Sequence, residues 1–314
     1  MGRIPECVLH IGAAKTGSTA IQTALTRQSE ELLEYGAFYP ASLRYRHGVT
    51  HRKLSLYAAD PGSRGRLTPA DVENERNDLR RKLSEELASL PRRPDVLLLS
   101  SEHCQSRLHT TAEVAVLKNL LSDYCDHVTV ILYLRPQHEA ALSFYSTNIK
   151  EGRPSAHPLS EDLVPPGYYD YGALVQRWST VFAKEDLVVR TFERARLVGG
   201  DLLADFGDAA DLPVKLTPGP TAVNPSLSPR GLRVLGAINR VLPAKVLGRS
   251  NLLRTPSIRA VEALFPGGGP TARRGELVQF FEKYSASNEV VRSMFFPDRP
   301  TLFTPDFSRY RNDR

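Results

Sequence analysis

The feature that most constrains the fold is an apolar run that ends in a glycine-containing turn near the N-terminus. The stretch VLHIGAAKTGSTAIQTAL covers residues 8–25, and four residues separate Gly12 from Gly17. The apolar segment 4–11 has the length of a buried parallel strand, and residues 17–28 are expected to form the helix that follows. Because a strand, a turn and a helix in this order are the basic unit of an α/β sheet, the sequence predicts an α/β fold.

Three further apolar segments have the length of buried strands. They are DVLLLSS, HVTVILYL and DLVVRTF, at 95–101, 127–134 and 186–192. Helices are expected over about 71–89, 112–124 and 136–150, and from near Tyr171 onward. Strands that alternate with helices predict right-handed crossovers and a parallel sheet with helices on both faces. In such sheets, ligands bind beyond the carboxyl ends of the strands.

The C-terminal part of the chain has a helical pattern instead. Beyond residue 225, one apolar stripe is formed by Leu232, Leu235, Ile238 and Leu242, and a long helix is expected over about 271–294. No break in composition divides the 314 residues, and an apolar fraction of 41% is typical of a globular chain with a sizeable core. The sequence therefore predicts one domain over 1–314, with an α/β core over about 4–230 and a helical extension over about 231–314.

Targeting and cysteine patterns favour a cytoplasmic protein. The first residues, MGRIPECVLHIG, lack the apolar run of a signal peptide, and no window approaches the roughly 20 apolar residues that a membrane helix needs. Cys7, Cys104 and Cys125 are odd in number and have no CxxC spacing. We therefore expect neither a disulfide framework nor a zinc site, and each cysteine is expected to be a small buried hydrophobe.

The distribution of charge indicates an anionic partner. The net charge is +6, and residues 228–274 contain nine Lys or Arg residues and a single acid, Glu262. No zinc-finger, homeodomain or RRM-type signature is present, and aromatic residues are not interleaved with this basic run, so nucleic acid is not the expected partner. A small polyanionic cofactor or an acidic sugar polymer fits the charge at least as well.

The glycine turn has the properties of an anion site. A turn that opens a helix presents backbone N–H groups and the positive end of the helix dipole, and Ser18 and Thr19 add hydroxyl donors. A P-loop that binds nucleoside triphosphates has its lysine directly after the second glycine, whereas here Lys15 stands two residues before Gly17. The alternative is a tight strand-to-helix turn without a ligand.

A second element follows the strand predicted at 127–134. Arg135 ends that strand, and Ser143 lies eight residues later on the next predicted helix. An arginine at this edge can clamp a phosphate with its planar guanidinium group, and the serine can supply a hydroxyl. Alone this pair is weak, because a serine on a helix surface is common.

Together the two elements resemble the sulfotransferases that use 3′-phosphoadenosine 5′-phosphosulfate (PAPS). KTGST at Lys15 to Thr19 is similar to the family's 5′-phosphosulfate loop, and Arg135 with Ser143 is similar to its 3′-phosphate motif. The resemblance to bacterial members extends over most of residues 5–230, through HIGAAKTGSTAIQ, LLLSSEH, YGALVQRWSTVF, RTFERARLVGGDLLADF and NPSLS. It implies a three-layer, P-loop-kinase-like fold.

The resemblance also implies roles for residues of the loop. The cofactor would be held by Ala14, Lys15, Thr16, Gly17, Ser18 and Thr19, together with Arg135 and Ser143. Lys15 would stabilise the bridging phosphate oxygen as an acceptor oxygen attacks sulfur in line, which is charge stabilisation at developing negative charge. A sulfuryl group carries less charge than a phosphoryl group, so no divalent metal is expected. The product would be 3′-phosphoadenosine 5′-phosphate (PAP).

A base is needed for the acceptor hydroxyl, and the segment SSEH offers Glu102 and His103 directly after a strand. Glu102 resembles the glutamate of the carbohydrate sulfotransferase branch and is favoured; His103 has an ordinary pKa that suits a base at neutral pH. Either could instead be a hydrogen-bonding residue at a strand end. His51, in the basic segment 44–53, is a candidate substrate-binding residue, and the segment could equally be a solvated loop.

Two further arginines and one further histidine have expected roles. Arg273 and Arg274 resemble a late 3′-phosphate contact of the family, although they stand at a predicted helix start. His10 is expected to be a buried, hydrogen-bonded histidine rather than a metal ligand.

The sequence thus favours a PAPS-dependent sulfotransferase whose acceptor is an alcohol, with a saccharide or glycolipid preferred to a small metabolite. One alternative is a nucleotide-dependent kinase with an altered P-loop. Another is a polyanion-binding relative that has lost catalysis.

Overall fold

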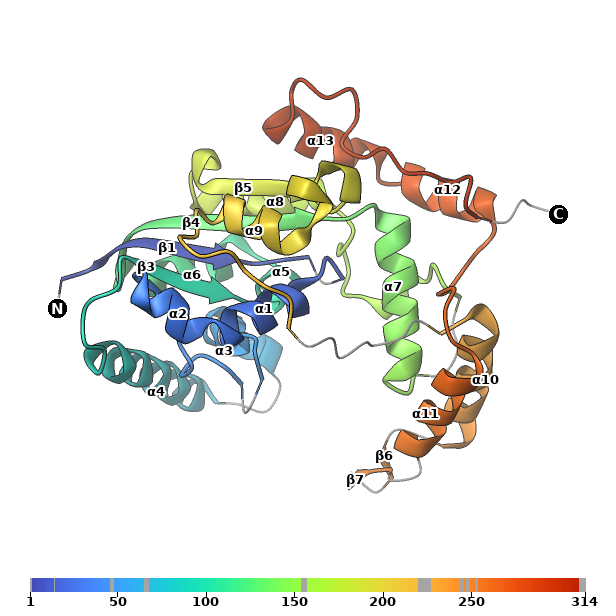
Figure 1. Ribbon diagram of the computed structural model, residues 1–314, viewed down its shortest axis with the longest axis horizontal. Helices are drawn as coiled ribbons and strands as arrows, with labels where there is room; N and C mark the ends of the chain where they lie inside the picture. Colours follow the sequence, from blue (N-terminus) through green and yellow to red (C-terminus); the bar gives the residue numbers. More distant parts are fainter. Residues whose placement is uncertain are drawn as a thin grey trace. The chain divides into compact units, whose positions relative to one another are not determined.

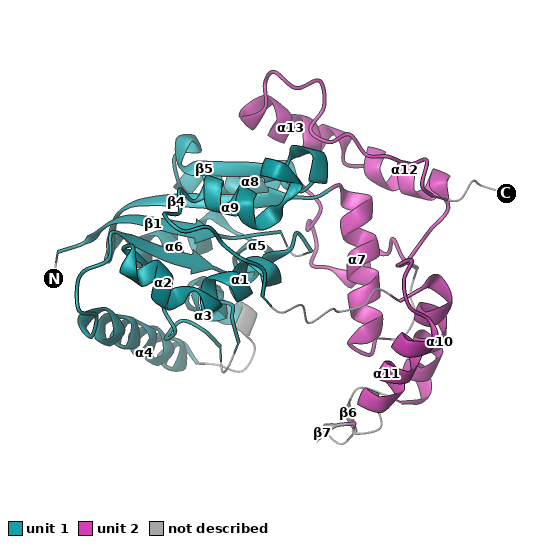
Figure 2. Ribbon diagram, in the orientation of Figure 1, with its two compact units in different colours: residues 1–135, 171–220 teal, residues 136–170, 221–314 magenta. Residues whose placement is uncertain are grey.

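The computed structural model describes most of the chain, in the ranges 2–13, 15–45, 48–64, 68–153, 157–219, 227–242, 245–246, 249–251 and 254–310. The chain forms two compact units, and each consists of two stretches of sequence (Figure 2). Unit 1 contains residues 1–135 and 171–220, and unit 2 contains residues 136–170 and 221–314. The prediction of a single domain over 1–314 stays a prediction.

Unit 1 is built on a five-stranded parallel sheet (Figure 1). Its strands are β1 (Ile4–His10), β2 (Ala37–Phe38), β3 (Val96–Ser100), β4 (Cys125–Leu134) and β5 (Leu187–Thr191), in the order β2-β3-β1-β4-β5. Every neighbouring pair is parallel, and His10 is paired with Ser100 on one side and Ile131 on the other. The strands are almost entirely apolar because both faces of a parallel sheet are covered.

Helices cover this sheet as the alternating pattern predicts. They are α1 (Ser18–Arg27), α2 (Ser29–Glu34), α3 (Arg52–Ala58), α4 (Pro69–Ala88), α5 (Glu102–Arg107), α6 (Thr111–Ser122), α8 (Tyr171–Val181) and α9 (Leu202–Ala209), with short 3₁₀ turns at Pro61–Arg64, Lys184–Asp186, Arg194–Arg196 and Val198–Gly200. Side chains of α1, α2 and α9 form one buried cluster with Val8, Leu98 and Ile131 of the sheet. Helices α6 and α8 pack together, and α6 also contacts β4. The three-layer α/β fold predicted from the sequence is therefore confirmed.

A histidine on β4 is placed between two carboxylates of unit 1. His127 Nδ1 lies 2.7 Å from Glu6 Oε2, and His127 Nε2 lies 2.9 Å from Asp186 Oδ1. The hydrogen bonds to Asp186 and Glu6 raise the pKa of His127, because they stabilise its charged form.

Unit 2 is helical in the residues that the structure describes, apart from two strands of two residues each. Its elements are α7 (Gln137–Lys150), a 3₁₀ turn (Glu161–Leu163), α10 (Pro229–Val241), β6 (Lys245–Val246), β7 (Arg249–Ser250), α11 (Arg254–Leu264), α12 (Arg274–Glu282) and α13 (Ser285–Phe295). Tyr145 and Ile149 of α7 share one core with Leu232 and Leu235 of α10 and Val261 of α11. Leu232, Leu235 and Ile238 of the predicted stripe thus form the core-facing side of α10, whereas Leu242 follows the helix as its C-cap.

The predicted strands and most predicted helices agree with the structure to within about two residues, whereas α2, β2, α3, α9 and α11 were not predicted and three further differences concern individual predictions. The long helix predicted over 271–294 is wrong, because the chain leaves the helical conformation at Tyr284 and forms α12 and α13 instead. Neither glycine nor proline marks this break, and these are the residues by which a break is usually recognised. Pro136 precedes α7 as its N-cap rather than its first residue. The segment after β3 forms the short helix α5, which was not predicted.

The cysteines and His10 are placed as predicted. Cys7, Cys104 and Cys125 are free and buried. His10 is fully buried, and its Nδ1 lies 2.8 Å from Ser100 Oγ.

Candidate functional site

Three neighbouring strands of unit 1 end at the segments that the sequence singled out. The glycine loop follows β1, Glu102 and His103 follow β3 on one side, and Arg135 follows β4 on the other. Because the strands are parallel, all three carboxyl ends lie at the same edge of the sheet. The fold therefore brings these segments together although they are far apart in the sequence.

The glycine loop has three residues in the left-handed backbone region. They are Gly12 (φ 35°), Lys15 (φ 73°) and Gly17 (φ 82°). Glycine adopts this conformation without a steric penalty, whereas a residue with a Cβ, such as Lys15, is strained there. Arg135 holds the strained residue, because its Nη1 donates a hydrogen bond of 3.0 Å to the Lys15 carbonyl oxygen.

The hydrogen bond from Arg135 to the Lys15 carbonyl also joins the glycine loop to the segment that follows β4. The Arg135 guanidinium group lies over the ring of Phe192, 5.6 Å from its centroid, and the Arg135 carbonyl accepts a 2.8 Å hydrogen bond from the Tyr171 hydroxyl. Phe192 and Tyr171 therefore hold Arg135 in place, and Arg135 in turn holds the glycine loop in place. Ser143 belongs to unit 2, where it is half-buried on α7 and its carbonyl accepts a hydrogen bond from Thr147. Its predicted cofactor contact stays a prediction.

The hydroxyl groups of the loop have different roles. Thr16 is buried and donates to the Ala13 carbonyl at 2.5 Å, so its hydroxyl stabilises the loop itself. Thr19 is exposed on the first turn of α1. Ser18 is buried, and its Oγ has no hydrogen-bond partner in the described part of the chain. Ala14, which the sequence also assigned to the loop, lies outside the described residues.

These features fit a bound phosphate or sulfate group. A buried hydroxyl without a partner is costly unless a ligand accepts its hydrogen bond. No side chain among the described residues caps the N-terminus of α1, so its first amide groups are available to an anion as well. A Cβ on Gly12 would stand 2.7 Å from Ser18 Oγ, so a side chain there would fill the space beside this hydroxyl.

Glu102, the first residue of α5, is held by donors from two other segments. Gln22 Nε2 of α1 donates to Glu102 Oε2 at 2.6 Å, and Thr50 Oγ1 donates to the same oxygen at 3.1 Å. Glu102 Oε1 lies 3.6 Å from His103 Nε2. The two donors thus occupy one carboxylate oxygen, and the other faces the imidazole.

The surroundings keep both candidate bases unprotonated at neutral pH. Burial would raise the pKa of Glu102, but the Gln22 hydrogen bond, the charge of His103, a backbone N–H and Thr50 outweigh it and lower that pKa. Burial also lowers the pKa of His103, against the opposing effect of Glu102, and the charges of Arg107 and Arg52 lower it further. Glu102 is therefore a carboxylate and His103 a neutral imidazole, so each can accept a proton.

His10 lies under the loop and is neutral. Burial lowers its pKa to about 4, against a weaker raising effect of Glu102. Its Nδ1 is bonded to Ser100 Oγ, which also receives a hydrogen bond from Gln22 at 3.3 Å. The buried polar groups of β1, β3 and α1 therefore form one connected network beneath the site.

His51, the candidate substrate-binding residue, lies inside the protein and is bonded to backbone groups. It is fully buried, and burial lowers its pKa to about 3, against the raising effect of its hydrogen bond to Pro40. Its Nε2–H donates to the Pro40 carbonyl at 2.8 Å, and its Nδ1 accepts from the Ser100 amide at 3.2 Å. Both ring nitrogens are thus engaged with backbone groups, and His51 joins the segment before α3 to the end of β3.

Arg273 and Arg274 are exposed at the start of α12 in unit 2, as the sequence predicts for a helix start. The Arg273 amide donates to Glu276 Oε2 at 3.0 Å. Their cofactor contact stays a prediction.

Sequence reasoning missed the residues that hold the base and the arginine. Gln22 could have been found, because it is a polar residue four positions after Ser18 on the predicted helix, and residues at that spacing share a face. Thr50, Phe192 and Tyr171 carry no local signal, since their roles depend on strands and loops that meet only in the fold.

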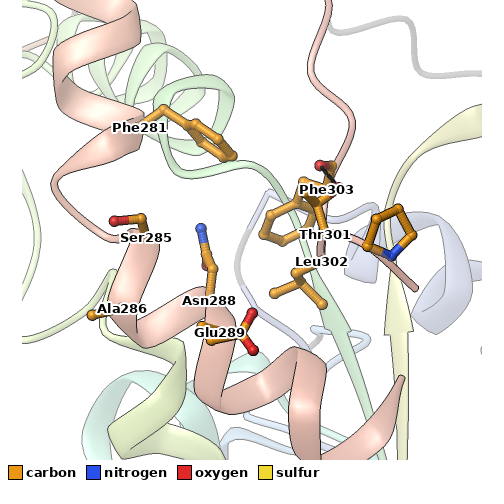
Figure 3. A pocket seen from close by; sticks show the side chains of 9 residues that line it. Phe281, Ser285, Ala286, Asn288, Glu289, Thr301, Leu302 and Phe303 are labelled. Atoms are coloured by element: carbon orange, nitrogen blue, oxygen red, sulfur yellow. Dashed lines mark hydrogen bonds between the residues drawn. The ribbon is translucent and has the colours of Figure 1, made fainter. Parts of the chain in front are cut away.

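Unit 2 contains a separate cavity of about 460 Å³ (Figure 3). Phe281, Leu302 and Phe303 contribute its apolar surface, and none of the predicted site residues lines it. Two of its polar side chains have partners: Asn288 is bonded to Gln137, and Glu289 is bonded to Arg292.

The described ranges contain neither a membrane-spanning helix nor a cluster of metal-binding side chains. No helix there is long and apolar enough to cross a membrane. No three His, Cys, Asp or Glu side chains are grouped there so that they could hold a metal ion.

Comparison with known proteins found similarity at the level of structure alone. No protein-family model matches the chain, and no curated protein matches it. A sulfotransferase from Alicyclobacillus acidocaldarius is similar with 16% identity and a TM-score of 0.45, over 84% of this chain and 96% of that one.

Two further solved structures show the same kind of similarity. A sulfotransferase domain from the curacin biosynthetic pathway has 11% identity and a TM-score of 0.40, over 84% of this chain and 98% of that domain. A sulfotransferase domain from the Synechococcus PCC 7002 olefin synthase has 12% identity and a TM-score of 0.39, over 84% and 96%.

Proposed function

We propose that this protein is a PAPS-dependent sulfotransferase that transfers a sulfuryl group to a hydroxyl of an acceptor. The observation that carries the proposal is the hydrogen bond from Arg135 to the Lys15 carbonyl. It joins the two segments that resemble the family's cofactor motifs. Both segments lie at the edge of the sheet where the ionised carboxylate of Glu102 follows the neighbouring strand β3. The preferred acceptor is a saccharide or a glycolipid, because Glu102 resembles the glutamate of the carbohydrate branch and the chain has basic loops.

The loop would hold the sulfated phosphate end of the cofactor. Ser18 Oγ and the first amide groups of α1 supply hydrogen-bond donors, and Lys15 and Arg135 supply positive charge. Ser143 is proposed as a further contact to the 3′-phosphate. When bound, PAPS supplies an activated sulfuryl group and a phosphate leaving group. Lys15 would offset the negative charge that develops on that phosphate, which is commonly the largest catalytic effect in such sites.

Glu102 is the proposed base. Its Oε2 accepts hydrogen bonds from Gln22 and Thr50, so its Oε1 would take the proton of the acceptor hydroxyl. His103, 3.6 Å from Oε1, can receive that proton next because it is neutral. Thr50 and Gln22 therefore act as positioning residues, and His51 acts with them by fixing the segment that carries Thr50.

Calorimetric titration tests the nucleotide. We expect PAP to bind in the micromolar range without Mg²⁺, and to bind more tightly than ATP. Equal or tighter binding of ATP would favour the altered kinase and overturn the proposal. Binding of PAP without any transfer of ³⁵S from labelled PAPS to a panel of saccharides and glycolipids would favour a relative that has lost catalysis.

Substitution of Lys15 tests the chemistry. Lys15→Ala should reduce turnover by two to three orders of magnitude, by analogy with the loss of one donor to a developing oxyanion, and should retain part of the PAP affinity. Lys82→Ala, which removes the same charge from α4, is the matched control and should leave both unchanged. Normal turnover of the Lys15 variant would show that this lysine is not the catalytic cation.

A further inference from the structure

Two arginines of unit 1 interact electrostatically with His103, the neighbour of the proposed base Glu102. Arg52 is the first residue of α3, and Arg107 is the last residue of α5, the helix that begins with Glu102. These two helices pack against each other. The charges of both guanidinium groups act on His103, the residue next to Glu102.

Hydrogen bonds fix the start of α3 next to Glu102. Thr50 Oγ1 donates to Glu102 Oε2 at 3.1 Å. One residue later, the His51 amide donates to the Ser100 carbonyl at 2.9 Å, and His51 Nδ1 accepts from the Ser100 amide. Because both contacts tie this segment to the end of β3, Arg52 begins its helix at the edge where Glu102 begins its own.

Neither arginine has an acidic partner among the described residues. The Arg52 guanidinium group lies over the ring of Tyr45, 5.0 Å from its centroid. Arg52 Nε is buried and has no hydrogen-bond partner. The Arg107 side chain likewise forms no hydrogen bond or ion pair there.

The two cations also repel each other. Partial burial lowers the pKa of Arg107, although its side chain is mainly exposed, and the charge of Arg52 lowers it further. Both arginines disfavour protonation of His103 in the same way. Two like charges that interact are unfavourable in the protein alone, and an anion bound by both would relieve this repulsion.

We propose that Arg52 and Arg107 bind an acidic group of the acceptor, so that the sulfated hydroxyl belongs to an anionic molecule. The assignment rests on the proposed sulfuryl transfer, since it treats the space beside Glu102 as the acceptor side of the site. A guanidinium group can form two parallel hydrogen bonds with a carboxylate or a sulfate. Held this way, the acceptor would present a neighbouring hydroxyl to Glu102.

Binding of simple sugars tests the proposal without requiring turnover. The acidic probes are methyl β-glucuronide and N-acetylglucosamine 6-sulfate, and the neutral ones are methyl β-glucoside and N-acetylglucosamine. Each is titrated by calorimetry into the full chain, with and without saturating PAP. We expect each acidic sugar that binds to be preferred to its neutral counterpart by at least about tenfold, since a hydrogen bond to a charged group is worth about that factor.

Variants assign the preference to the two arginines. Arg52→Gln keeps a side chain that can pack on Tyr45, and Arg107→Gln changes an exposed position, so both should fold. Each should reduce the preference for the acidic sugar in part, and the double variant should abolish it. Arg81→Ala, which removes one positive charge from the exposed face of α4, is the control and should leave the preference unchanged.

The outcomes separate this proposal from the proposed function. Preference for the glucuronide identifies a carboxylate, and preference for the 6-sulfate identifies a sulfate; either result supports the proposal. Equal binding of acidic and neutral sugars, no binding of any of them, or a preference that survives in the double variant would overturn it. A loss of PAP affinity in the arginine variants would also overturn it, because the pair would then belong to the cofactor site. Failure of PAP to bind the unaltered protein would instead overturn the proposed function.

Discussion

Replacing Gln22 with methionine removes the closest donor to the proposed base and keeps the length of the side chain. Gln22 is almost fully buried, and its Nε2 lies 2.6 Å from Glu102 Oε2. A hydrogen bond to a charged group contributes about 1.5–3 kcal/mol. Because about 1.4 kcal/mol corresponds to a factor of ten, its loss should tighten proton binding to Glu102 by at least roughly tenfold.

The expected effect on catalysis depends on pH. A general base must be deprotonated, so kcat/KM falls as the pH falls through the pKa of that base. In the unaltered protein the pKa of Glu102 is lowered, and the fall in kcat/KM begins only in clearly acidic solution. In Gln22→Met that fall should begin at higher pH, while kcat/KM at neutral pH and above changes little.

The assay is the initial rate of ³⁵S transfer from labelled PAPS, measured as kcat/KM from clearly acidic to neutral pH. Thr50→Val is the matched comparison, because it removes the longer hydrogen bond, of 3.1 Å, to the same oxygen. Its pH profile should move in the same direction by a smaller amount. A uniform loss of rate at every pH in Gln22→Met, with the profile unmoved, would refute the reasoning: Gln22 would then be structural only, or Glu102 would not be the base.

Arg135→Met should weaken PAP binding about 10- to 100-fold in calorimetry, since it removes a charged contact and the bond that holds Lys15; unchanged affinity would contradict this. Gly17→Ala should lower the free energy of unfolding in urea by at least about 1–2 kcal/mol, because φ is 82° there. Gly207→Ala, inside α9 and with open space around the new Cβ, should instead raise it by about 0.5–1 kcal/mol. His127 has a raised pKa, so its two ion pairs stabilise the fold fully below its unfolded pKa near 6.5 and lose this effect as the pH rises through its higher folded pKa. The melting temperature should therefore fall over that pH range in the unaltered protein and fall less in His127→Gln. Because the His127 side chain is exposed, the contribution to the free energy of unfolding should stay below about 1 kcal/mol. Equal pH profiles of the two proteins would contradict this prediction.

The sequence predicted four of the five strands of the sheet because most of their residues are buried, whereas β2, with two residues, is too short to be recognised. Strands such as β3 and β4 are continuous apolar runs bounded by polar segments, and such runs are recognisable without knowledge of their neighbours. The residues directly after them could be predicted as a site by the same logic, since parallel strands align their carboxyl ends. Lys15, Glu102 and Arg135 were found in this way.

The partners of those residues could not be predicted, because they come from segments without a periodic pattern. α5 has six residues, which is too short for a helical period to show, and its start at Glu102 was read as a strand end. The segment before α3 looked like a solvated basic loop, although His51 within it is fully buried. Its burial depends on the Pro40 carbonyl and the Ser100 amide, which are adjacent to it only in the folded chain.

Different residues around Glu102 hold the base in place and would select the acceptor. Thr50 and His51 use a hydroxyl, a ring and backbone groups to attach the start of α3 to Glu102 and β3. Arg52, the next residue, contributes no bond to this attachment among the described residues. A change of its side chain should therefore alter the charge beside the base and leave the position of the base intact. For this reason, substitutions of Arg52 should change which acceptors are used, whereas substitutions of Thr50 should change the pH dependence of every acceptor alike.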